Sequence, residues 1–500
     1  MQANISTVGQ IYKNTYAPDK TAVIFGEERV SYAELDDRVR AFANFLKAKG
    51  VKKGDKVMLD AGNCPEFIYI YCGTVRNAAV IVPVNPMLTP TELIYIAKDS
   101  EAKFLLIKEA VMQKLGHTEE TLSEALGLTV MALNEGLTAD AMASPRDDFD
   151  LVTDMEELST FLYTSGTTGY PKAAMLTHSN LISNAWQTQQ ALEAVHEDVF
   201  MCVLPMFHVF AYTAAIHLPL FLGATVAIIE TFYPKTVMGS LIEHSVTVFL
   251  GVPAMYMMFI EAGKNNIFFP KLRIAISGGA PLPVDVYHKS IEIAHLPIIE
   301  GYGLTEASPS SAFNPPSGVR KPGSIGPAIA EVDAIIGGEN NEELPIGEVG
   351  ELLLRGPNVM QGYYGRPEET AEALRGGWLH TGDLAKMDED RYIYIVDRKK
   401  DMIIVAGLNV YPREIEEALF DHPKVRDAAV VGEPDALRGE SVVAYVVLKE
   451  GEEAHHKEIL RWLRERLATY KIPRRLEFVE ELPRNSSGKI IKRALRKEAE

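Results

Sequence analysis

The segment YTSGTTGYPK, residues 163–172, follows an apolar stretch and combines glycines, hydroxyl side chains and a lysine. Glycines let the backbone bend so that N–H groups converge on an anion, while the hydroxyls add hydrogen-bond donors and Lys172 adds positive charge. No Gly-Lys-Ser/Thr closes the segment, so it differs from the usual nucleotide P-loop. We predict a phosphate-binding loop here; a flexible connection rich in serine, threonine and glycine is the alternative.

Strand and helix patterns alternate on both sides of this loop. Residues 56–62 predict a buried strand, residues 65–80 a helix, and residues 80–84 the next strand. Further strand patterns follow the loop, at residues 224–229, 246–251 and 272–277. Strands that alternate with helices form parallel sheets covered on both faces, so we predict an α/β fold for most of the chain.

The pattern changes towards the C-terminus. Residues 321–354 show short strands separated by glycine and proline turns (GSIGPAI, DAIIGG and GELLLRG), which predicts a small antiparallel or β-barrel-like subdomain. Later, an amphipathic helix at residues 412–422, the strands AAVVG and SVVAYVVL, and a helix around residues 458–467 predict a compact α+β domain.

The polar link DRKKD at residues 397–401 is the natural boundary between these parts. We therefore expect an N-terminal domain over residues 1–397, a hinge over residues 398–401 and a C-terminal domain over residues 402–500. A chain of 500 residues is expected to form two to four domains in any case.

Composition indicates a soluble protein. Apolar residues make up 47% of the chain and charged residues 24%, as in globular proteins. The longest apolar stretch, residues 209–229, contains His217, Pro219 and Gly223, which favours a buried helix and strand over a membrane span. No secretory signal is evident. We expect no transmembrane segment, and contact with membranes only when an apolar substrate is collected.

Charge and cysteine usage narrow the partners and the compartment. A net charge of −18 argues against a nucleic-acid partner, because such binding depends largely on neutralising phosphates. The three cysteines, Cys64, Cys72 and Cys202, form neither a disulfide framework nor a paired metal-ligand spacing. This usage suits the reducing cytoplasm, so we expect a cytoplasmic protein. A homodimer is a further expectation.

The phosphate-loop segment resembles that of the adenylate-forming enzymes, which include acyl-CoA synthetases, firefly-type luciferases and the adenylation domains of peptide synthetases. Other motifs of that family occur in order and extend the resemblance over nearly the whole chain. They are SGGAP at residues 277–281, GYGLTE at 301–306, TGD at 381–383, DR at 397–398 and NSSGK at 485–489. The chain looks closest to the bacterial medium- or long-chain fatty-acid CoA ligases.

The resemblance implies an enzyme that uses ATP, Mg²⁺ and coenzyme A in two half-reactions. A carboxylate attacks the α-phosphorus of ATP and expels pyrophosphate. The thiol of coenzyme A then attacks the acyl-adenylate and expels AMP. The first step brings an anion towards a polyanion, so cations, hydrogen-bond donors and a metal are required.

The resemblance also implies the nucleotide contacts. Tyr302 stacks on adenine, Thr305 donates to the α-phosphate, Asp383 accepts hydrogen bonds from both ribose hydroxyls, and Arg398 reaches the same sugar. The β- and γ-phosphates are held by Thr164, Ser165, Gly166, Thr167, Thr168, Gly169 and Lys172. The adenine site is completed by Gly278, Gly279, Ala280, Pro281, Gly301 and Gly303. Taken singly, such tyrosine or aspartate residues are more often structural.

Catalytic and metal roles follow in the same way. Glu306 is expected to bind Mg²⁺, with Thr164 as a second ligand. Lys489 is expected to neutralise charge between the carboxylate and the α-phosphate during adenylation. His208 corresponds to a histidine beside the acyl carboxylate, with a positioning or gating role; a core histidine is the alternative.

The resemblance further implies that the small C-terminal domain is mobile. It rotates about Lys400 between the half-reactions, and the second arrangement presents Gly407 on the pantetheine path. Two residues depart from the family pattern, because Ala173 and Ala406 stand where the family favours glycine. Each adds one methyl group, so we expect altered loop mobility or rate and no loss of activity.

The acid is expected to be a medium- or long-chain fatty acid. No carboxylate follows His208 to pair with a substrate ammonium, so amino acids are disfavoured. The expected pocket walls suit an alkyl chain. They are Phe207, Val209, Phe210, Val252, Pro253, Ser277 and Gly303. The alternatives are an aryl acid such as a cinnamate or benzoate, acyl transfer to a carrier protein, a luciferase-like oxygenase, and a non-catalytic protein on the same fold.

Overall fold

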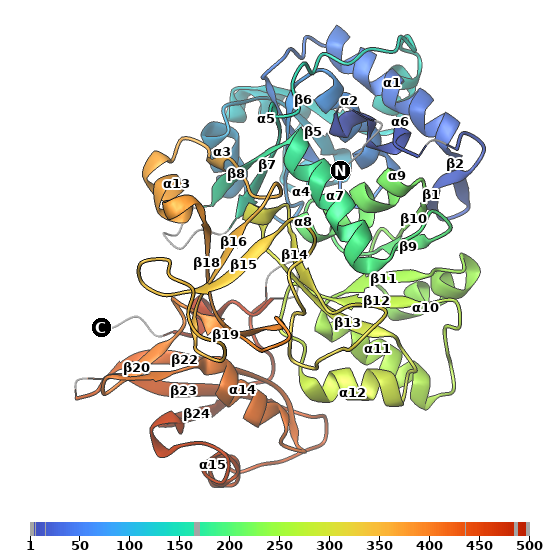
Figure 1. Cartoon of the computed structure of the whole chain (residues 1–500). Helices are drawn as coiled ribbons and strands as arrows, with labels where there is room; N and C mark the ends of the chain where they lie inside the picture. Colours follow the sequence, from blue (N-terminus) through green and yellow to red (C-terminus); the bar gives the residue numbers. More distant parts are fainter. Residues whose placement is uncertain are drawn as a thin grey trace.

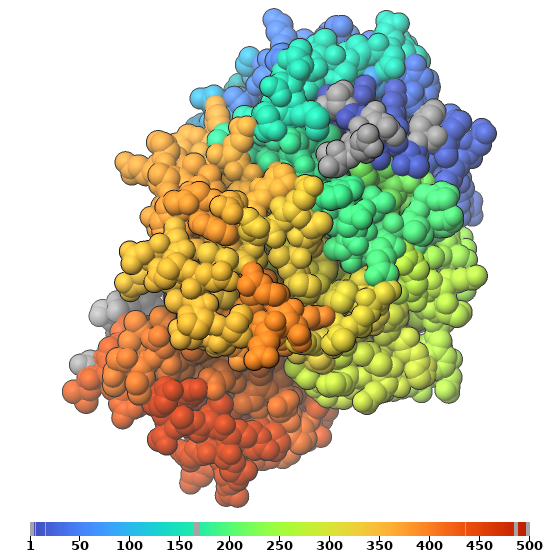
Figure 2. Space-filling model, in the orientation of Figure 1, coloured from blue at the N-terminus to red at the C-terminus, as the bar shows by residue number. Residues whose placement is uncertain are grey.

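The computed structural model describes residues 5, 7–15, 17–164, 171–435, 437–484 and 489–496. Most elements before residue 400 belong to two large sheets and the helices that cover them (Figure 1). The C-terminal elements lie together at one end of the molecule (Figure 1). The space-filling view shows these C-terminal residues as a red-orange lobe against the yellow and green parts (Figure 2).

One large sheet carries the predicted phosphate loop. Its strand order is β17-β8-β7-β4-β3-β5-β6. The strands are β3 (Lys56–Asp60), β4 (Val80–Pro83), β5 (Ala102–Lys108), β6 (Thr129–Leu133), β7 (Leu158–Thr164), β8 (Lys172–Thr177) and β17 (Gly362–Tyr363). Strands β7, β4, β3, β5 and β6 are parallel, whereas β8 pairs antiparallel with both β7 and β17. This confirms the predicted parallel sheet and adds an antiparallel edge.

The second large sheet has the order β14-β13-β12-β11-β9-β10-β1-β2. Its strands are β1 (Thr21–Phe25), β2 (Glu28–Ser31), β9 (Val199–Cys202), β10 (Thr225–Ile228), β11 (Val248–Gly251), β12 (Ile274–Ser277), β13 (Ile298–Gly303) and β14 (Ser310–Phe313). The central strands are parallel and buried throughout, which explains their unbroken apolar sequences.

Helices cover these sheets, and many begin at clear sequence signals. Ser31 and Glu34 form a capping box at the start of α1, and Thr89 and Glu92 do the same for α3. The helices of this part are α1 (Tyr32–Ala48), α2 (Pro65–Arg76), α3 (Pro90–Asp99), α4 (Glu109–Lys114), α5 (Glu119–Leu126), α6 (Glu135–Met142), α7 (His178–Leu192), α8 (Val209–Ala211), α9 (Leu218–Leu222), α10 (Pro234–Glu243), α11 (Pro253–Lys264), α12 (Val284–Glu292) and α13 (Pro367–Ala373).

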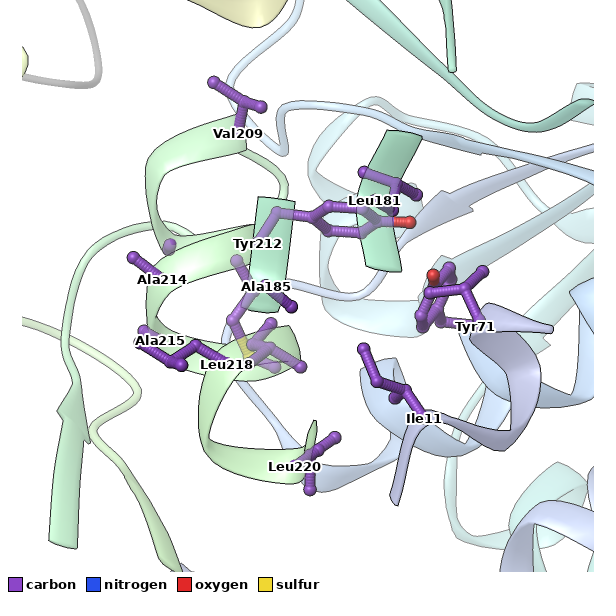
Figure 3. Packing of buried hydrophobic residues seen from close by; sticks show 14 of the residues in the cluster. Ile11, Tyr71, Leu181, Ala185, Val209, Tyr212, Ala214, Ala215, Leu218 and Leu220 are labelled. Carbon is purple, nitrogen blue, oxygen red and sulfur yellow. The ribbon is translucent and has the colours of Figure 1, made fainter. Parts of the chain in front are cut away.

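The long apolar stretch is a buried helical segment followed by β10, as predicted. A π-helical turn, η2 (Tyr212–His217), joins α8 to α9. Figure 3 shows Tyr212 and Leu218 of this segment packed beside Leu181 and Ala185 of α7, and all four are fully buried. In the described part of the chain, no helix is both long enough and apolar enough to cross a membrane.

The predicted small subdomain is an antiparallel sheet with the order β15-β16-β18-β19. Its strands are β15 (Asp333–Gly337), β16 (Gly350–Arg355), β18 (Leu379–Met387) and β19 (Ile393–Arg398). The expected strand GSIGPAI forms only isolated bridges, at Gly326 and Ala328. Pro327 has no N–H to donate, and Gly326 has a φ of 84°, which breaks the extended conformation.

The C-terminal residues form an α+β unit with its own apolar cores, as predicted. The strand order is β21-β20-β23-β22, and β24 pairs with β23. The elements are β20 (Ile403–Val405), β21 (Leu408–Val410), α14 (Pro412–Phe420), β22 (Val425–Asp435), β23 (Gly439–Leu448), α15 (His456–Arg464) and β24 (Arg475–Phe478).

Candidate active site

The β7–β8 pair positions the two ends of the predicted phosphate loop. Thr164 at the end of β7 lies opposite Lys172 at the start of β8. The Lys172 ammonium lies 5.3 Å from the centroid of the Tyr363 ring and 3.8 Å from Oε1 of Glu369. A cation is therefore held at the mouth of the loop. The loop residues themselves lie outside the described residues: Ser165, Gly166, Thr167, Thr168 and Gly169.

The Ala173 departure is accommodated by this strand pair. Ala173 lies opposite Tyr163, is fully buried, and belongs to a hydrophobic cluster that includes Phe161. Its methyl group thus fills core space behind the loop.

Glu306 is held in place by a residue that sequence reasoning missed. It lies in the short helical turn η3 (Thr305–Ala307), directly after β13. The Tyr363 hydroxyl donates to Oε1 of Glu306 at 2.7 Å, and the Met360 N–H donates to the Glu306 carbonyl at 2.9 Å. Burial, then the nearby Glu306 carboxylate, raises the pKa of Tyr363, so the phenol remains a donor at neutral pH. Tyr363 belongs to none of the recognised motifs; its role follows only from the pairing of β17 with β8.

The donor set near the loop fits Mg²⁺. Glu306 supplies a carboxylate that is already oriented, and Thr164 supplies a hydroxyl at the loop edge. Among the described residues, no three His, Cys, Asp or Glu side chains gather as a metal site. Mg²⁺ in phosphate-transfer sites is commonly held by one or two carboxylates plus substrate phosphates and water, so no such cluster is required.

Asp383 of the TGD motif contacts residues from two other motifs, GYGLTE and DR. Its backbone pairs with Arg398 across β18 and β19, and its Oδ1 lies 3.1 Å from Nε of Arg398. The Tyr302 hydroxyl of β13 donates to its Oδ2 at 2.5 Å. Burial, then the Asp383 carboxylate, raises the pKa of Tyr302 well above its usual range. The structure thus brings the predicted adenine and ribose residues together and fixes the Tyr302 ring beside Asp383.

The predicted adenine-binding glycines lie where side chains do not fit. A Cβ on Gly301 would lie 2.3 Å from the Phe313 ring, and a Cβ on Gly278 would lie 3.0 Å from the Phe210 ring. Gly279 has a φ of 77°. The remaining residues of these segments are Ala280, Pro281 and Gly303, which are partly or fully exposed. Close packing against aromatic rings therefore explains Gly301 and Gly278, and the positive φ explains Gly279.

Lys489 lies near Asp383, Arg398 and Lys400. Its side chain keeps solvent contact, yet protein atoms surround its ammonium, and this burial, followed by the charges of Arg398 and Lys400, lowers its pKa to about 8. The Asp383 carboxylate acts in the opposite direction. The preceding residues of its motif, 485–488, lie outside the described residues. Lys489 is therefore gathered with the predicted ribose residues although it comes from the far end of the chain.

His208 lies between β9 and α8, near enough to Lys489 to feel its charge. Burial, then the positive charge of Lys489, lowers the pKa of His208 to about 4, so the ring is neutral at physiological pH. Its Nδ1 accepts a hydrogen bond from the Phe210 N–H at 3.3 Å. Nε2 is then the protonated nitrogen and a hydrogen-bond donor.

Lys400 and Gly407, the two residues linked to the expected domain rotation, lie in different environments. Lys400 follows β19, and burial, then the Arg398 charge, lowers its pKa. Gly407 is exposed at the tip of the β20–β21 hairpin, with a φ of 82°, and Ala406 beside it has a φ of 51°. The observed arrangement thus presents Lys489 to Asp383 and leaves Gly407 on the surface.

The expected acyl-pocket residues lie on several elements of the second large sheet and its helices. Phe207, Phe210 and Val252 are partly buried and pack against the main core, which includes Val209. Thr305, which is expected to donate to the α-phosphate, precedes Glu306 in the same η3 turn. The remaining three expected pocket residues are Pro253, at the start of α11, the buried Ser277, at the end of β12, and the exposed Gly303, at the end of β13.

Comparison with known proteins gives consistent similarities. Residues 12–364 match the AMP-binding enzyme family, and residues 414–489 match the AMP-binding enzyme C-terminal domain. A long-chain-fatty-acid–CoA ligase of Bacillus subtilis (strain 168) is 35% identical over 96% of this chain and 92% of the relative. A feruloyl-CoA synthase of Amycolatopsis sp is 37% identical over 96% of both chains. The structure of ATP-bound MatB from Rhodopseudomonas palustris is similar with a TM-score of 0.92 and 33% identity, over 98% of both chains.

Proposed function

Because the chain belongs to the AMP-binding enzyme family and is an acid–CoA ligase that uses ATP, Mg²⁺ and coenzyme A, we propose that it activates a medium- or long-chain fatty acid through an acyl-adenylate. The convergence of Tyr302, Arg398 and Lys489 on Asp383 supports this proposal most strongly. These residues come from separate motifs, and together they supply a ring face, a ribose acceptor and two cations.

The first half-reaction needs positive charge where carboxylate and triphosphate meet. Lys489 interacts electrostatically with both Asp383 and His208, and in this proposal it provides that charge to the attacking carboxylate and the α-phosphate. Its pKa of about 8 leaves it mostly protonated at neutral pH. The neutral His208 offers its Nε2–H to the acyl carboxylate and positions it.

The triphosphate of ATP is assigned to the residues around Lys172 and Glu306. Lys172 and the loop after Thr164 hold the β- and γ-phosphates, while Thr305 donates to the α-phosphate. Glu306, oriented by Tyr363, and Thr164 would hold Mg²⁺. When bound, Mg²⁺ neutralises charge on the phosphate oxygens.

The second half-reaction is assigned to a rotated C-terminal domain. In this proposal residues 1–397 form the stationary domain, residues 398–401 the hinge with Lys400, and residues 402–500 the moving domain. Rotation withdraws Lys489 and brings the exposed hairpin tip with Gly407 towards the adenylate. Closure motions of this kind commonly turn on a few polar residues.

The substrate proposal rests on the apolar surroundings of His208. Phe207, Phe210 and Val252 suit an alkyl chain, at about 0.8 kcal/mol per buried methylene. An aryl acid is the second candidate, favoured by the similarity to a feruloyl-CoA synthase.

ATP–pyrophosphate exchange with a panel of fatty, aryl and amino acids tests both proposals. We expect exchange with fatty acids of eight or more carbons, roughly, and acyl-CoA formation when coenzyme A is added. Higher kcat/KM for an aryl acid than for every fatty acid would overturn the substrate proposal. Absence of exchange with every acid would overturn the adenylation mechanism.

A further inference from the structure

Arg413 connects the C-terminal domain to the sheet that carries Asp383. It is the second residue of α14, which lies beside β19 (Figure 1). Its Nη1 donates to the Ile395 carbonyl at 2.8 Å, and its backbone N–H donates to Oδ2 of Asp397 at 2.8 Å. Its Nε donates to Glu417 of the same helix at 3.0 Å. Two of these three bonds therefore cross the proposed hinge.

The same guanidinium acts electrostatically, with no direct hydrogen bond in the described part of the chain, on a buried carboxyl group of the stationary domain. Glu300 lies on β13 immediately before Gly301, is 4% exposed, and accepts a hydrogen bond from the Leu282 N–H at 3.4 Å. Burial raises the pKa of Glu300 to about 7. The Arg413 charge lowers this pKa, and the Glu417 charge raises it. Leu282 directly follows the predicted adenine segment, so Glu300 joins both segments that line the adenine site.

We propose that Arg413 is a positioning residue for adenylation, which holds the C-terminal domain in the arrangement that brings Lys489 to Asp383. Rotation about Lys400 would break the bond to the Ile395 carbonyl and take the guanidinium away from Glu300. The pKa of Glu300 would then rise further, because the Arg413 charge would no longer lower it, and the favourable interaction with Arg413 would be lost. Arg413 thus stabilises the observed arrangement relative to the rotated one, and it also links the domain position to the adenine segments.

This inference rests on the proposed role of Lys489, and it predicts an asymmetric effect on the two half-reactions. Arg413→Met removes the side-chain bond to the Ile395 carbonyl and the charge near Glu300, but keeps the apolar stem and the backbone bond to Asp397. The population with Lys489 beside Asp383 therefore decreases. We expect pyrophosphate exchange to fall by about tenfold, a typical coupling magnitude. Thioester formation from premade acyl-adenylate and coenzyme A should be unchanged or faster. Arg413→Lys keeps the charge near Glu300 and should recover part of the exchange activity.

Glu417→Gln is the matched control. It removes a partner of Arg413 that belongs to the same helix and leaves the bonds that cross the hinge. We expect its two half-reaction rates to keep the wild-type ratio. Circular dichroism and thermal melting of each variant establish that it is folded.

Equal losses in both half-reactions for Arg413→Met, or no loss in a folded Arg413→Met protein, would overturn the inference. If Arg413→Met failed to fold, the Arg413→Lys ratio would decide, and a wild-type ratio there would overturn the inference. Failure of the proposed function looks different, because the wild-type protein would then exchange no pyrophosphate with any acid.

Discussion

Replacing Tyr363 with phenylalanine removes one hydroxyl from the proposed magnesium site and keeps the ring. That hydroxyl donates to Oε1 of Glu306 at 2.7 Å, while the ring face carries the Lys172 ammonium 5.3 Å from its centroid. The substitution therefore separates the orientation of Glu306 from the placement of Lys172. Because burial and Glu306 raise the pKa of Tyr363, the phenol donates throughout the accessible pH range.

The magnitude follows from the charge on the acceptor. A hydrogen bond to a charged group contributes about 1.5–3 kcal/mol. Loss of a partner that orients a metal ligand typically lowers metal affinity or activity about 10–100-fold. We therefore expect the Mg²⁺ concentration for half-maximal pyrophosphate exchange to rise by about tenfold or more, with little change in the KM for the acid.

The assay is pyrophosphate exchange as a function of free Mg²⁺ at saturating acid. Tyr364→Phe is the matched control, since the Tyr364 hydroxyl donates to Glu101 at 2.6 Å and has no bond to Glu306 among the contacts of the described residues. We expect the control to have the wild-type Mg²⁺ dependence. An unchanged Mg²⁺ dependence in Tyr363→Phe, or an equal shift in both variants, would refute the assignment of Glu306 and Tyr363.

Three further substitutions and one pH profile test the residues assigned to the two half-reactions. Lys489→Ala should lower pyrophosphate exchange by about 10²–10³-fold and spare thioester formation from premade acyl-adenylate; equal losses would contradict its role. In the wild-type enzyme, kcat/KM for ATP should decline as pH rises through about 8, because the lowered pKa of Lys489 leaves it charged below that pH and neutral above it. Lys489→Ala should lack this decline. A flat wild-type profile between pH 7 and pH 9 would count against the role of Lys489. Lys400→Pro should restrict the hinge, lower thioester formation by about tenfold or more and preserve exchange; unchanged overall turnover would reject rotation about this residue. Ala406 has a φ of 51°, a left-handed backbone conformation that costs about 1 kcal/mol for a residue with a Cβ. Ala406→Gly should remove this cost and raise the rate of thioester formation, while pyrophosphate exchange stays constant. An equal change in both reactions would show that the hairpin tip has no specific part in the second step.

Local sequence signals were sufficient for most of the fold. Unbroken apolar runs identified the parallel strands because strands buried on both faces need no alternation. Capping residues such as Ser31 stabilise helix starts, since a side chain there satisfies free backbone N–H groups. The expected strand GSIGPAI was wrong because Gly326 and Pro327 favour bridges over a continuous ladder.

The sequence by itself identified motifs whose described residues the structure gathers near Asp383, because the motifs around Asp383 and Lys489 carry their chemistry within a few adjacent positions. Only the tertiary structure decided how these residues are held. The bonds from Tyr363 to Glu306 and from Arg413 to Ile395 join segments whose neighbours along the chain give no sign of the partner. Such contacts depend on strand pairing and domain docking, which arise when distant parts of the chain pack together.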